Sequence, residues 1–295
     1  MTNTTENLTG NAGDAERGAR SPRGVSVVVT GASGRTGSRV ARAARAAGLS
    51  VRAVSRATGF DWWDPATWAD TLRGADAAYL AVPSDVGAPG AARAVGALAR
   101  EAVGLGVRRL VLLSARGEEQ ALPAEEALRA SGAVWTVVRA AWFAQNFSEG
   151  PLAAELRESG GLVFPAAEVR EPFVDVRDVA DVVVTALTAG DRYAGRILTV
   201  SGGQLLTFGE AVAEIARATG RPLTYRAVGT HEYGGALAGF GMPPEEVAAM
   251  TAIFDTLLDG RNAHLSDGVR EVLGRAPRAF SDFVREEAAA GTWTV

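Results

Sequence analysis

Short apolar runs alternate with alanine-rich helical segments through the first half of the chain. The apolar runs, several of them rich in valine, lie at residues 25–29, 51–55, 77–82, 107–114 and 134–139, and a brief strand is expected at 60–62. Runs of this length are typical of parallel strands buried on both faces. Because strand and helix alternate regularly up to residue 140, the pattern predicts an α/β fold built on a doubly wound parallel sheet.

Beyond residue 140 the pattern is less regular. Strands are predicted at 196–200 and 223–228, helices at 178–187 and 207–220, and residues 230–290 are expected to be mostly helical. Thr207 and Glu210 have the spacing of a capping box, and Asp178 is interpreted as a helix cap rather than a catalytic acid. Residues 1–23 are polar, which predicts a disordered leader and neither a signal peptide nor a membrane anchor.

Three glycines separate the first strand from the first helix. Gly31, Gly34 and Gly37 form a G-x-x-G-x-x-G pattern, which differs from the G-x-G-x-x-G of the standard dinucleotide fingerprint. A helix N-terminus has unpaired N–H groups and a partial positive charge, and glycines let a pyrophosphate approach the backbone. We therefore predict that this turn binds a dinucleotide; the alternative is a glycine-rich loop that only turns the chain.

The end of the second strand indicates which dinucleotide binds. An acidic residue there would bind the ribose hydroxyls of NAD, whereas an arginine accommodates the 2′-phosphate of NADP. Ser55 and Arg56 occupy this point, and Arg35 projects from the glycine turn nearby. Asp61 lies a few residues further on and is a candidate for contact with the adenine or the ribose. These residues favour NADP(H) over NAD(H), unless Arg56 is an ordinary exposed arginine.

The composition excludes several kinds of chemistry. The 295 residues contain no cysteine and no lysine, so disulfides, thiolate sites and lysine Schiff bases are excluded. Two histidines, His231 and His264, are too few for a multi-histidine site, and no metal is expected. The net charge of −4 gives no broad basic surface for nucleic acid, and no apolar run approaches the length of a membrane span. We expect a cytoplasmic monomer or homodimer with a small-molecule substrate.

Several of these segments together resemble the NmrA-like group of atypical short-chain dehydrogenases/reductases. The resemblance covers nearly everything from Val25 to Trp293, and it lies in GASGRTG (31–37), SR (55–56), FDWWDPATW (60–68), YLAVP (79–83), RRLVLLSARG (108–117), ALRASGAVWTVVRAAWFAQNFSEG (127–150) and FVDVRDVADVVVTAL (173–187). Within the group, FDWWDPATW, WFAQNFSEG, MPPEEVAAMTAIFDTLLDGRNA (242–263) and PRAFSDFVREEAAAGTW (277–293) resemble the ergot-alkaloid, festuclavine-dehydrogenase-like branch.

The resemblance implies a Rossmann domain at residues 24–150, to which segments such as 172–200 return, and a smaller α+β substrate lobe, mainly within 151–295. It also implies which residues hold the cofactor. The phosphates would be held by Gly31, Ser33, Gly34, Arg35, Thr36 and Gly37, the adenosine 2′ position by Ser55 and Arg56, and the rest of the cofactor would lie along Ala81, Val82 and Pro83. Ser114 falls where many short-chain reductases have their active-site serine.

One departure from the wider superfamily changes the expected chemistry. The Tyr-x-x-x-Lys pair that protonates the product oxygen is missing, because the segment after Ser114 has no tyrosine and the chain has no lysine. The four tyrosines are Tyr79, Tyr193, Tyr225 and Tyr233. An iminium carbon accepts hydride without a proton donor, and a quinone or conjugated enone can be protonated later. The sequence therefore predicts an NAD(P)H-dependent reductase of such a substrate, in secondary metabolism.

The expected substrate pocket is aromatic, and its residues are open to other interpretations. Ser114 would orient the substrate, or instead contact nicotinamide or cap a helix. Trp142, Phe143 and Phe173 would stack on the substrate and Asn146 would shape the pocket, unless they are core and turn residues. Tyr233, in the pocket, and His231 would supply a proton from the smaller lobe, unless they are exposed loop residues. Arg139 would touch a ligand or support the loop beneath the site. Two other functions fit the missing pair equally: a non-catalytic NAD(P) sensor of the NmrA type, and a redox-silent cyclase or coupling enzyme.

Overall fold

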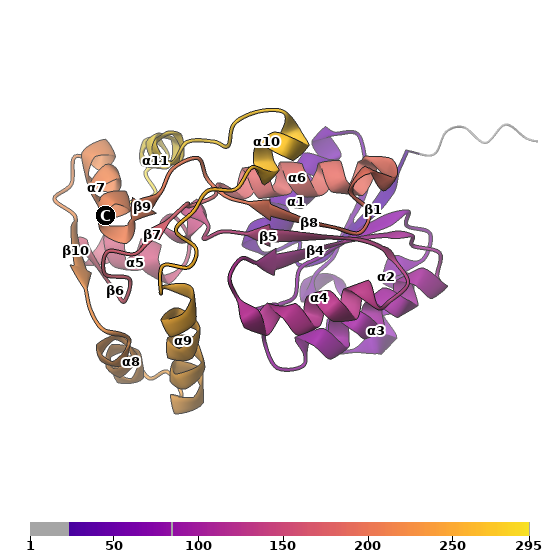
Figure 1. Ribbon diagram of the computed structural model, residues 1–295, viewed down its shortest axis with the longest axis horizontal. Helices are drawn as coiled ribbons and strands as arrows, with labels where there is room; N and C mark the ends of the chain where they lie inside the picture. Colours follow the sequence, from indigo (N-terminus) through magenta and orange to yellow (C-terminus); the bar gives the residue numbers. More distant parts are fainter. Residues whose placement is uncertain (1–23, 84, 295) are drawn as a thin grey trace, which may run out of the picture.

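A six-stranded parallel sheet forms the centre of the molecule (Figure 1). The computed structural model describes residues 24–83 and 85–294, so the predicted leader at 1–23 lies outside the described residues. The strand order is β2-β1-β3-β4-β5-β8, and every pairing is parallel. The predicted doubly wound sheet is confirmed, and its order reverses between β1 and β3. The strands are β1 (Ser26–Val29), β2 (Ser50–Ala53), β3 (Ala77–Leu80), β4 (Arg109–Ala115), β5 (Val134–Ala140) and β8 (Arg196–Val200).

The crossover from β2 to β3 contains no strand, so the prediction of one at 60–62 is wrong. The described segment instead forms two 3₁₀ turns, η1 (Arg56–Thr58) and η2 (Pro65–Thr67), followed by the short helix α2 (Trp68–Leu72). Asp61 is the cause, because its side chain accepts the N–H of Trp63 at 2.9 Å and its carbonyl accepts the indole N–H of Trp68 at 2.8 Å. These bonds fold the backbone back on itself, and it cannot join a ladder of strands.

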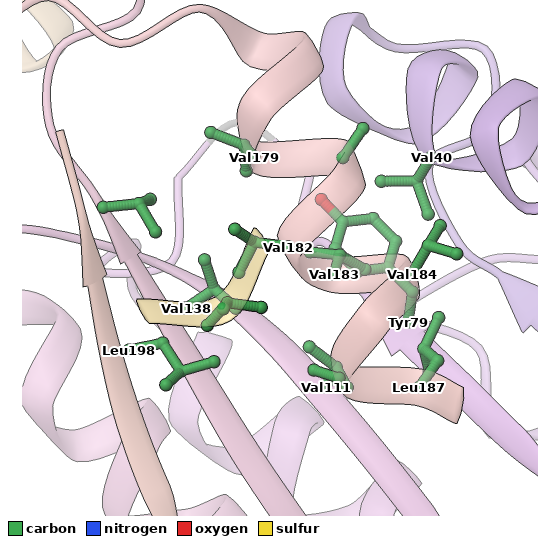
Figure 2. Close-up of a cluster of buried hydrophobic side chains, with 14 of the residues drawn as sticks. Val40, Tyr79, Val111, Val138, Val179, Val182, Val183, Val184, Leu187 and Leu198 are labelled. Atoms are coloured by element: carbon green, nitrogen blue, oxygen red, sulfur yellow. The ribbon is translucent and has the colours of Figure 1, made fainter. Parts of the chain in front are cut away.

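Helices cover both faces of the sheet. α1 (Arg35–Ala46) and α6 (Val176–Thr188) pack together on one face, while α2, α3 (Ala91–Gly104) and α4 (Leu122–Arg129) cover the other. In Figure 2, Val182 and Val183 of α6 lie among Val40 of α1, Tyr79 of β3 and Val138 of β5. Because these side chains are fully buried, they hold α1 firmly against the sheet, and the glycine turn that precedes α1 is held with it.

The N-cap of helix α6 lies three residues before the predicted cap. Asp175 is the residue at its N-cap, where the carboxylate accepts the N–H of Arg177 at 2.8 Å. Asp178, which the sequence suggested as the cap, lies in the first turn with no exposed surface. Its carboxylate accepts the backbone N–H of Arg278 at 2.7 Å and pairs with Arg275 at 2.7 Å. Asp178 therefore ties the C-terminal segment to the sheet layer, and its interpretation as a cap is wrong.

The remaining elements form a smaller lobe beside the sheet, drawn at the left in Figure 1. Two small sheets lie in it, β6 paired with β10 in parallel and β7 paired with β9 in antiparallel. The predicted capping box is confirmed, because the N–H of Glu210 binds the hydroxyl of Thr207 at 3.0 Å and the N–H of Thr207 binds the carboxylate of Glu210 at 2.8 Å. The lobe comprises α5 (Pro151–Glu158), β6 (Gly161–Phe164), β7 (Arg170–Glu171), β9 (Leu206–Thr207), α7 (Phe208–Thr219), β10 (Thr224–Ala227), α8 (Thr230–Gly239), α9 (Pro244–Leu257) and α11 (Phe280–Ala289).

Aromatic side chains make the core of this lobe. Phe164 and Phe208 stack at 4.8 Å between ring centroids, and Phe147 meets Phe173 edge to face at 5.1 Å. The indole N–H of Trp293 binds the carbonyl of Phe147 at 2.7 Å and so fixes the end of the described chain to this core. One further helix, α10 (Gly268–Leu273), packs on α6 and β8. In the part of the chain that the structure describes, no helix combines the length and the apolarity that crossing a bilayer requires.

Candidate cofactor and substrate site

The glycine turn brings bare backbone to the start of α1. Gly31 has a φ of +63°, a conformation that favours glycine, and its carbonyl accepts the N–H of Gly34 at 2.8 Å. A Cβ on Gly37 would lie 2.2 Å from the carbonyl oxygen of Gly31, so only glycine permits this contact between helix and turn. No side chain caps α1, whose N-cap is Gly34. The N–H groups of the first turn of α1 are thus available to an anion.

A hollow of about 250 Å³ lies over this turn and collects most of the predicted cofactor residues. They come from three segments that the sheet brings together at its carboxyl edge: the glycine turn, the end of β2 and the end of β3. Their members are Gly31, Ser33, Gly34 and Thr36 from the first, Ser55 and Arg56 from the second, and Ala81, Val82 and Pro83 from the third. Gly37 lies beneath the turn and does not line the hollow.

Phe60 and Trp62 also line this hollow, although sequence reasoning did not assign them to the cofactor. Both side chains are almost wholly buried and meet edge to face at 6.1 Å. The sequence pattern that could have assigned them is the group of aromatic residues directly after the end of β2, which instead led to the prediction of a strand. Asp61, the predicted contact for adenine or ribose, does not line the hollow, because its carboxylate accepts the N–H of Trp63.

Arg35 corrects a second expectation. Its guanidinium does not share the hollow with Arg56 but donates to the carboxylate of Glu149 at 3.2 Å, to the carbonyl of the same residue at 3.0 Å, and to the side-chain oxygen of Asn146. Arg39 pairs with Glu149 as well. Arg35 therefore links the start of α1 to the segment that leads into the smaller lobe, and Arg56 is the sole charged side chain lining the hollow within the described residues.

A second cleft, of about 330 Å³, adjoins the first. Val82 lines both spaces, which makes them neighbours along the carboxyl edge of the sheet. The predicted residues Ser114, Trp142, Phe143 and Asn146 all line this cleft. Sequence reasoning missed several other lining residues, contributed by the segment after β3, by the end of β4 and by α9: Asp85, Val86, Leu113, Arg116, Glu118, Ile253, Phe254 and Leu257.

Phe173 and Tyr233 do not line the cleft, which corrects their predicted role. Phe173 is only 3% exposed, because it packs edge to face against Phe147 and Phe208. Tyr233 packs on Phe164 at 5.5 Å between centroids, and burial raises its pKa above the ordinary value. Trp142 contacts Phe208 at 5.4 Å. Trp142 is therefore both a wall of the cleft and a part of the aromatic core, so lying in a pocket and lying in the core are not exclusive for this residue.

The hydroxyl of Ser114 is occupied by a buried network. It donates to Oε1 of Glu125 at 2.6 Å, and Arg139 donates to the two oxygens of the same carboxylate at 2.8 and 2.6 Å. Ser114 and Arg139 are register partners on β4 and β5, so the network clamps the two strand ends to α4. The hydrogen bond to Glu125 raises the pKa of Arg139 above its ordinary value. Arg139 thus supports the cleft from beneath, and Ser114 has a structural partner.

None of the four tyrosines lines the cleft. Tyr79 and Tyr193 are buried in the sheet layer, and Tyr225 donates to the carbonyl of Phe164 at 3.2 Å. The carboxyl groups in the cleft are those of Asp85 and Glu118. Burial, together with the neighbouring Asp85 carboxyl, raises the pKa of Glu118 to about 8. A tyrosine proton donor is therefore lacking in the described cleft, whereas a buried carboxyl group with a raised pKa is present.

These features define a Rossmann-type α/β protein with a glycine turn before its first helix and an adjoining cleft with aromatic walls. Residues 120–271 match the model of the NmrA-like family. The chain belongs to this family. It is an oxidoreductase with a nicotinamide dinucleotide as its cofactor.

The relatives include reductases of several kinds. An NAD(P)H azoreductase of Xenophilus azovorans is 30% identical over 251 residues, which cover 82% of this chain and 85% of that protein. An agroclavine dehydrogenase of Claviceps fusiformis is 33% identical over 61% of this chain and 65% of that protein. A (4-alkanoyl-5-oxo-2,5-dihydrofuran-3-yl)methyl phosphate reductase of Streptomyces griseus is 33% identical over 82% of this chain and 85% of that protein. The predicted resemblance, including that to the ergot-alkaloid branch, is confirmed.

Among solved structures, the triphenylmethane reductase of Citrobacter complexed with NADP(H) has the same fold. It superposes with a TM-score of 0.71 at 21% identity, over 89% of this chain and 99% of that one. At this identity the likeness concerns the fold.

Proposed function

We propose that the protein is an NADPH-dependent reductase of a small, flat, conjugated electrophile, namely an iminium, a quinone or an enone, and that it acts in secondary metabolism. The observation that carries this proposal is the shared wall at Val82. A dinucleotide whose phosphates lie on the glycine turn has its nicotinamide end at the carboxyl edge of the sheet, where the aromatic cleft begins. A substrate between Trp142 and Phe143 would then lie beside the hydride donor.

The proposed preference for NADPH rests on the charge in the first hollow. Arg56 is its only charged lining residue in the described chain, and Ser55 lies next to it. A guanidinium suits the 2′-phosphate, whereas an acidic residue would suit the free ribose hydroxyls. Asp61, the acid predicted to contact the ribose, has its carboxylate engaged by the backbone of Trp63.

The proposed substrate class rests on the missing proton donor and on the walls of the cleft. When bound, the nicotinamide supplies hydride. The chain positions the substrate and shields it: Trp142, Phe143 and Phe254 offer flat apolar surfaces, and the partly enclosed space reduces access of water. The names of the relatives support the same class, because they describe an azoreductase and a reductase of an acylated oxo-dihydrofuran. Both names denote conjugated, electron-poor substrates.

The decisive experiment follows the absorbance of NADPH with a panel of quinones, azo dyes, cyclic iminium ions and conjugated enones. Binding of NADPH and NADH is measured separately by calorimetry. We expect NADPH to bind and to be oxidised by at least one member of the panel. Tight binding with no oxidation across a wide panel would refute the reductase assignment in favour of a sensor or a redox-silent enzyme. Failure to bind either dinucleotide would refute the site itself.

A further inference from the structure

Reduction of a quinone or an enone needs a proton as well as a hydride, and the inference made here rests on the reductase function proposed above. The ionisable side chains that line the described cleft are Arg35, Asp85, Arg116 and Glu118. Arginine stays protonated and does not give up a proton at ordinary pH. A proton donor within the described cleft is therefore one of its two carboxyl groups.

Glu118 is held in an unusual place for a carboxyl group. It follows the end of β4 and is 4% exposed, and its Oε1 has no hydrogen-bond partner in the described part of the chain. A Cβ on Gly87 would lie 2.3 Å from this Oε1, so the glycine lets the carboxyl group pack against the backbone after β3. An ionised carboxylate without a partner is costly to bury, and this geometry favours the protonated form.

The charged groups around Glu118 also leave its protonated form favoured. The Asp85 carboxyl faces it within hydrogen-bonding reach, and two such groups side by side retain a proton between them. Two nearby guanidiniums donate to other carboxylates, Arg139 to Glu125 and Arg261 to Asp259 and Glu119. Arg116 donates through Nη2 to the carbonyls of Asn262 and His264, and its buried Nε and Nη1 have no partner in the described chain. No ion pair to Glu118 occurs in the described chain.

We propose that Glu118 is the proton donor of this reduction, a catalytic residue that replaces the missing tyrosine. Hydride adds to the β-carbon of an enone, or of the enone unit of a quinone. The Cα=Cβ π pair then forms a new π bond between Cα and the carbonyl carbon, and the carbonyl π pair moves onto the carbonyl oxygen. The O–H bond of Glu118 breaks and its proton bonds to that oxygen. The substrate gains two electrons and two hydrogens, the dinucleotide is oxidised by two electrons, and Glu118 is left as a carboxylate.

Glu118 also borders a second space, from which its proton would be renewed. Glu118 also lines a second hollow of about 230 Å³, together with Gly117, Glu119, Leu122 and Arg261. Glu119 and Arg261 are both exposed at its rim. Glu118 thus borders both the substrate cleft and a hollow with exposed residues. This position suits a residue that must take up one proton in every turnover.

The test compares Glu118→Gln with the wild type on two substrates, a quinone and a cyclic iminium ion that needs no proton. In the wild type, we expect kcat for the quinone to fall as the pH rises through about 8. In E118Q, kcat for the quinone should fall by about 10²-fold or more at neutral pH and lose this pH dependence. Reduction of the iminium ion should change by less than about threefold, and NADPH binding should be retained.

Two further variants complete the design. Asp85→Asn should move the pH midpoint of quinone reduction downward, because it removes the negative charge beside Glu118. Glu126→Gln, an exposed carboxyl of α4 that lines neither the cleft nor the second hollow, is the matched control and should leave both reactions unchanged. If E118Q keeps the quinone rate and its midpoint, or loses both reactions alike, the assignment is overturned while the reductase function stands. Wild-type protein that reduces neither substrate would overturn both proposals.

Discussion

Replacing Ser114 by alanine separates a structural serine from a catalytic one. Its hydroxyl donates to Glu125 at 2.6 Å inside the buried network that joins β4, β5 and α4. A hydrogen bond to a charged group contributes about 1.5–3 kcal/mol. Since Oε1 of Glu125 keeps its bond from Arg139 at 2.8 Å, we expect the cost of S114A at the lower end of that range, about 1.5–2 kcal/mol. The melting temperature should fall by about 2–6 °C, and kcat/KM by less than about threefold.

The assay measures thermal unfolding and NADPH-dependent reduction in the same preparations. Glu125→Gln serves as the companion variant, because it keeps the size of the side chain but removes the charge that holds Arg139. A double-mutant cycle between S114A and E125Q should yield a coupling energy of about 1 kcal/mol, since the two side chains share one hydrogen bond. A fall of about 10²-fold in kcat with unchanged stability would refute this reasoning and would make Ser114 a catalytic residue.

Three other predictions concern single side chains. Arg56→Asp should weaken NADPH binding by about 1–3 kcal/mol and leave NADH binding almost unchanged; calorimetry that gives an unaltered NADPH/NADH ratio would contradict the 2′-phosphate assignment. Gly37→Ala should lower the free energy of unfolding by about 1–3 kcal/mol in denaturant unfolding, because its Cβ would lie 2.2 Å from the carbonyl oxygen of Gly31. Gly34→Ala should cost less, because its Cβ would lie 3.2 Å from the same oxygen. Equal effects of the two substitutions would argue against the close contact at Gly37. Burial raises the pKa of Glu171 to about 7, so the folded state holds a proton that the unfolded state loses near pH 4.5, and the free energy of unfolding should decline between these pH values as the pH rises. Glu171→Gln should remove this decline, which reaches up to about 3 kcal/mol at pH 8. Parallel curves of stability against pH for the two proteins would exclude this role of Glu171.

Local patterns carried the prediction of the fold. The parallel sheet followed from short apolar runs, and the tight glycine turn before α1 followed from glycine spacing, because both depend on neighbours within a few residues. The strand expected at 60–62 failed for a reason of the same kind. Asp61 accepts hydrogen bonds from Trp63 and Trp68, and these local bonds compete with strand pairing.

The direction of side chains at the site could not be predicted in the same way. Arg35 was expected beside Arg56, but its partners Asn146 and Glu149 lie more than 100 residues further along the chain. Phe173 was expected in the pocket, yet the aromatic core of the lobe buries it. In each case the residue type was read correctly, and the neighbour that determined its orientation came from a distant segment.

The end of β4 explains why sequence reasoning found a serine and missed an acid. Ser114 lies in β4, while Arg116 and Glu118 belong to the turn that follows it, where Gly117 has a φ of +79°, and all three side chains line the cleft. The resemblance drew attention to Ser114 because short-chain reductases keep a serine there. In this chain the hydroxyl of Ser114 binds Glu125, and Arg116 binds backbone carbonyls of the loop after α9. Of the three, Glu118 alone has a proton to give and a buried oxygen without a partner, so the loss of the tyrosine–lysine pair and the burial of this glutamate have a single explanation.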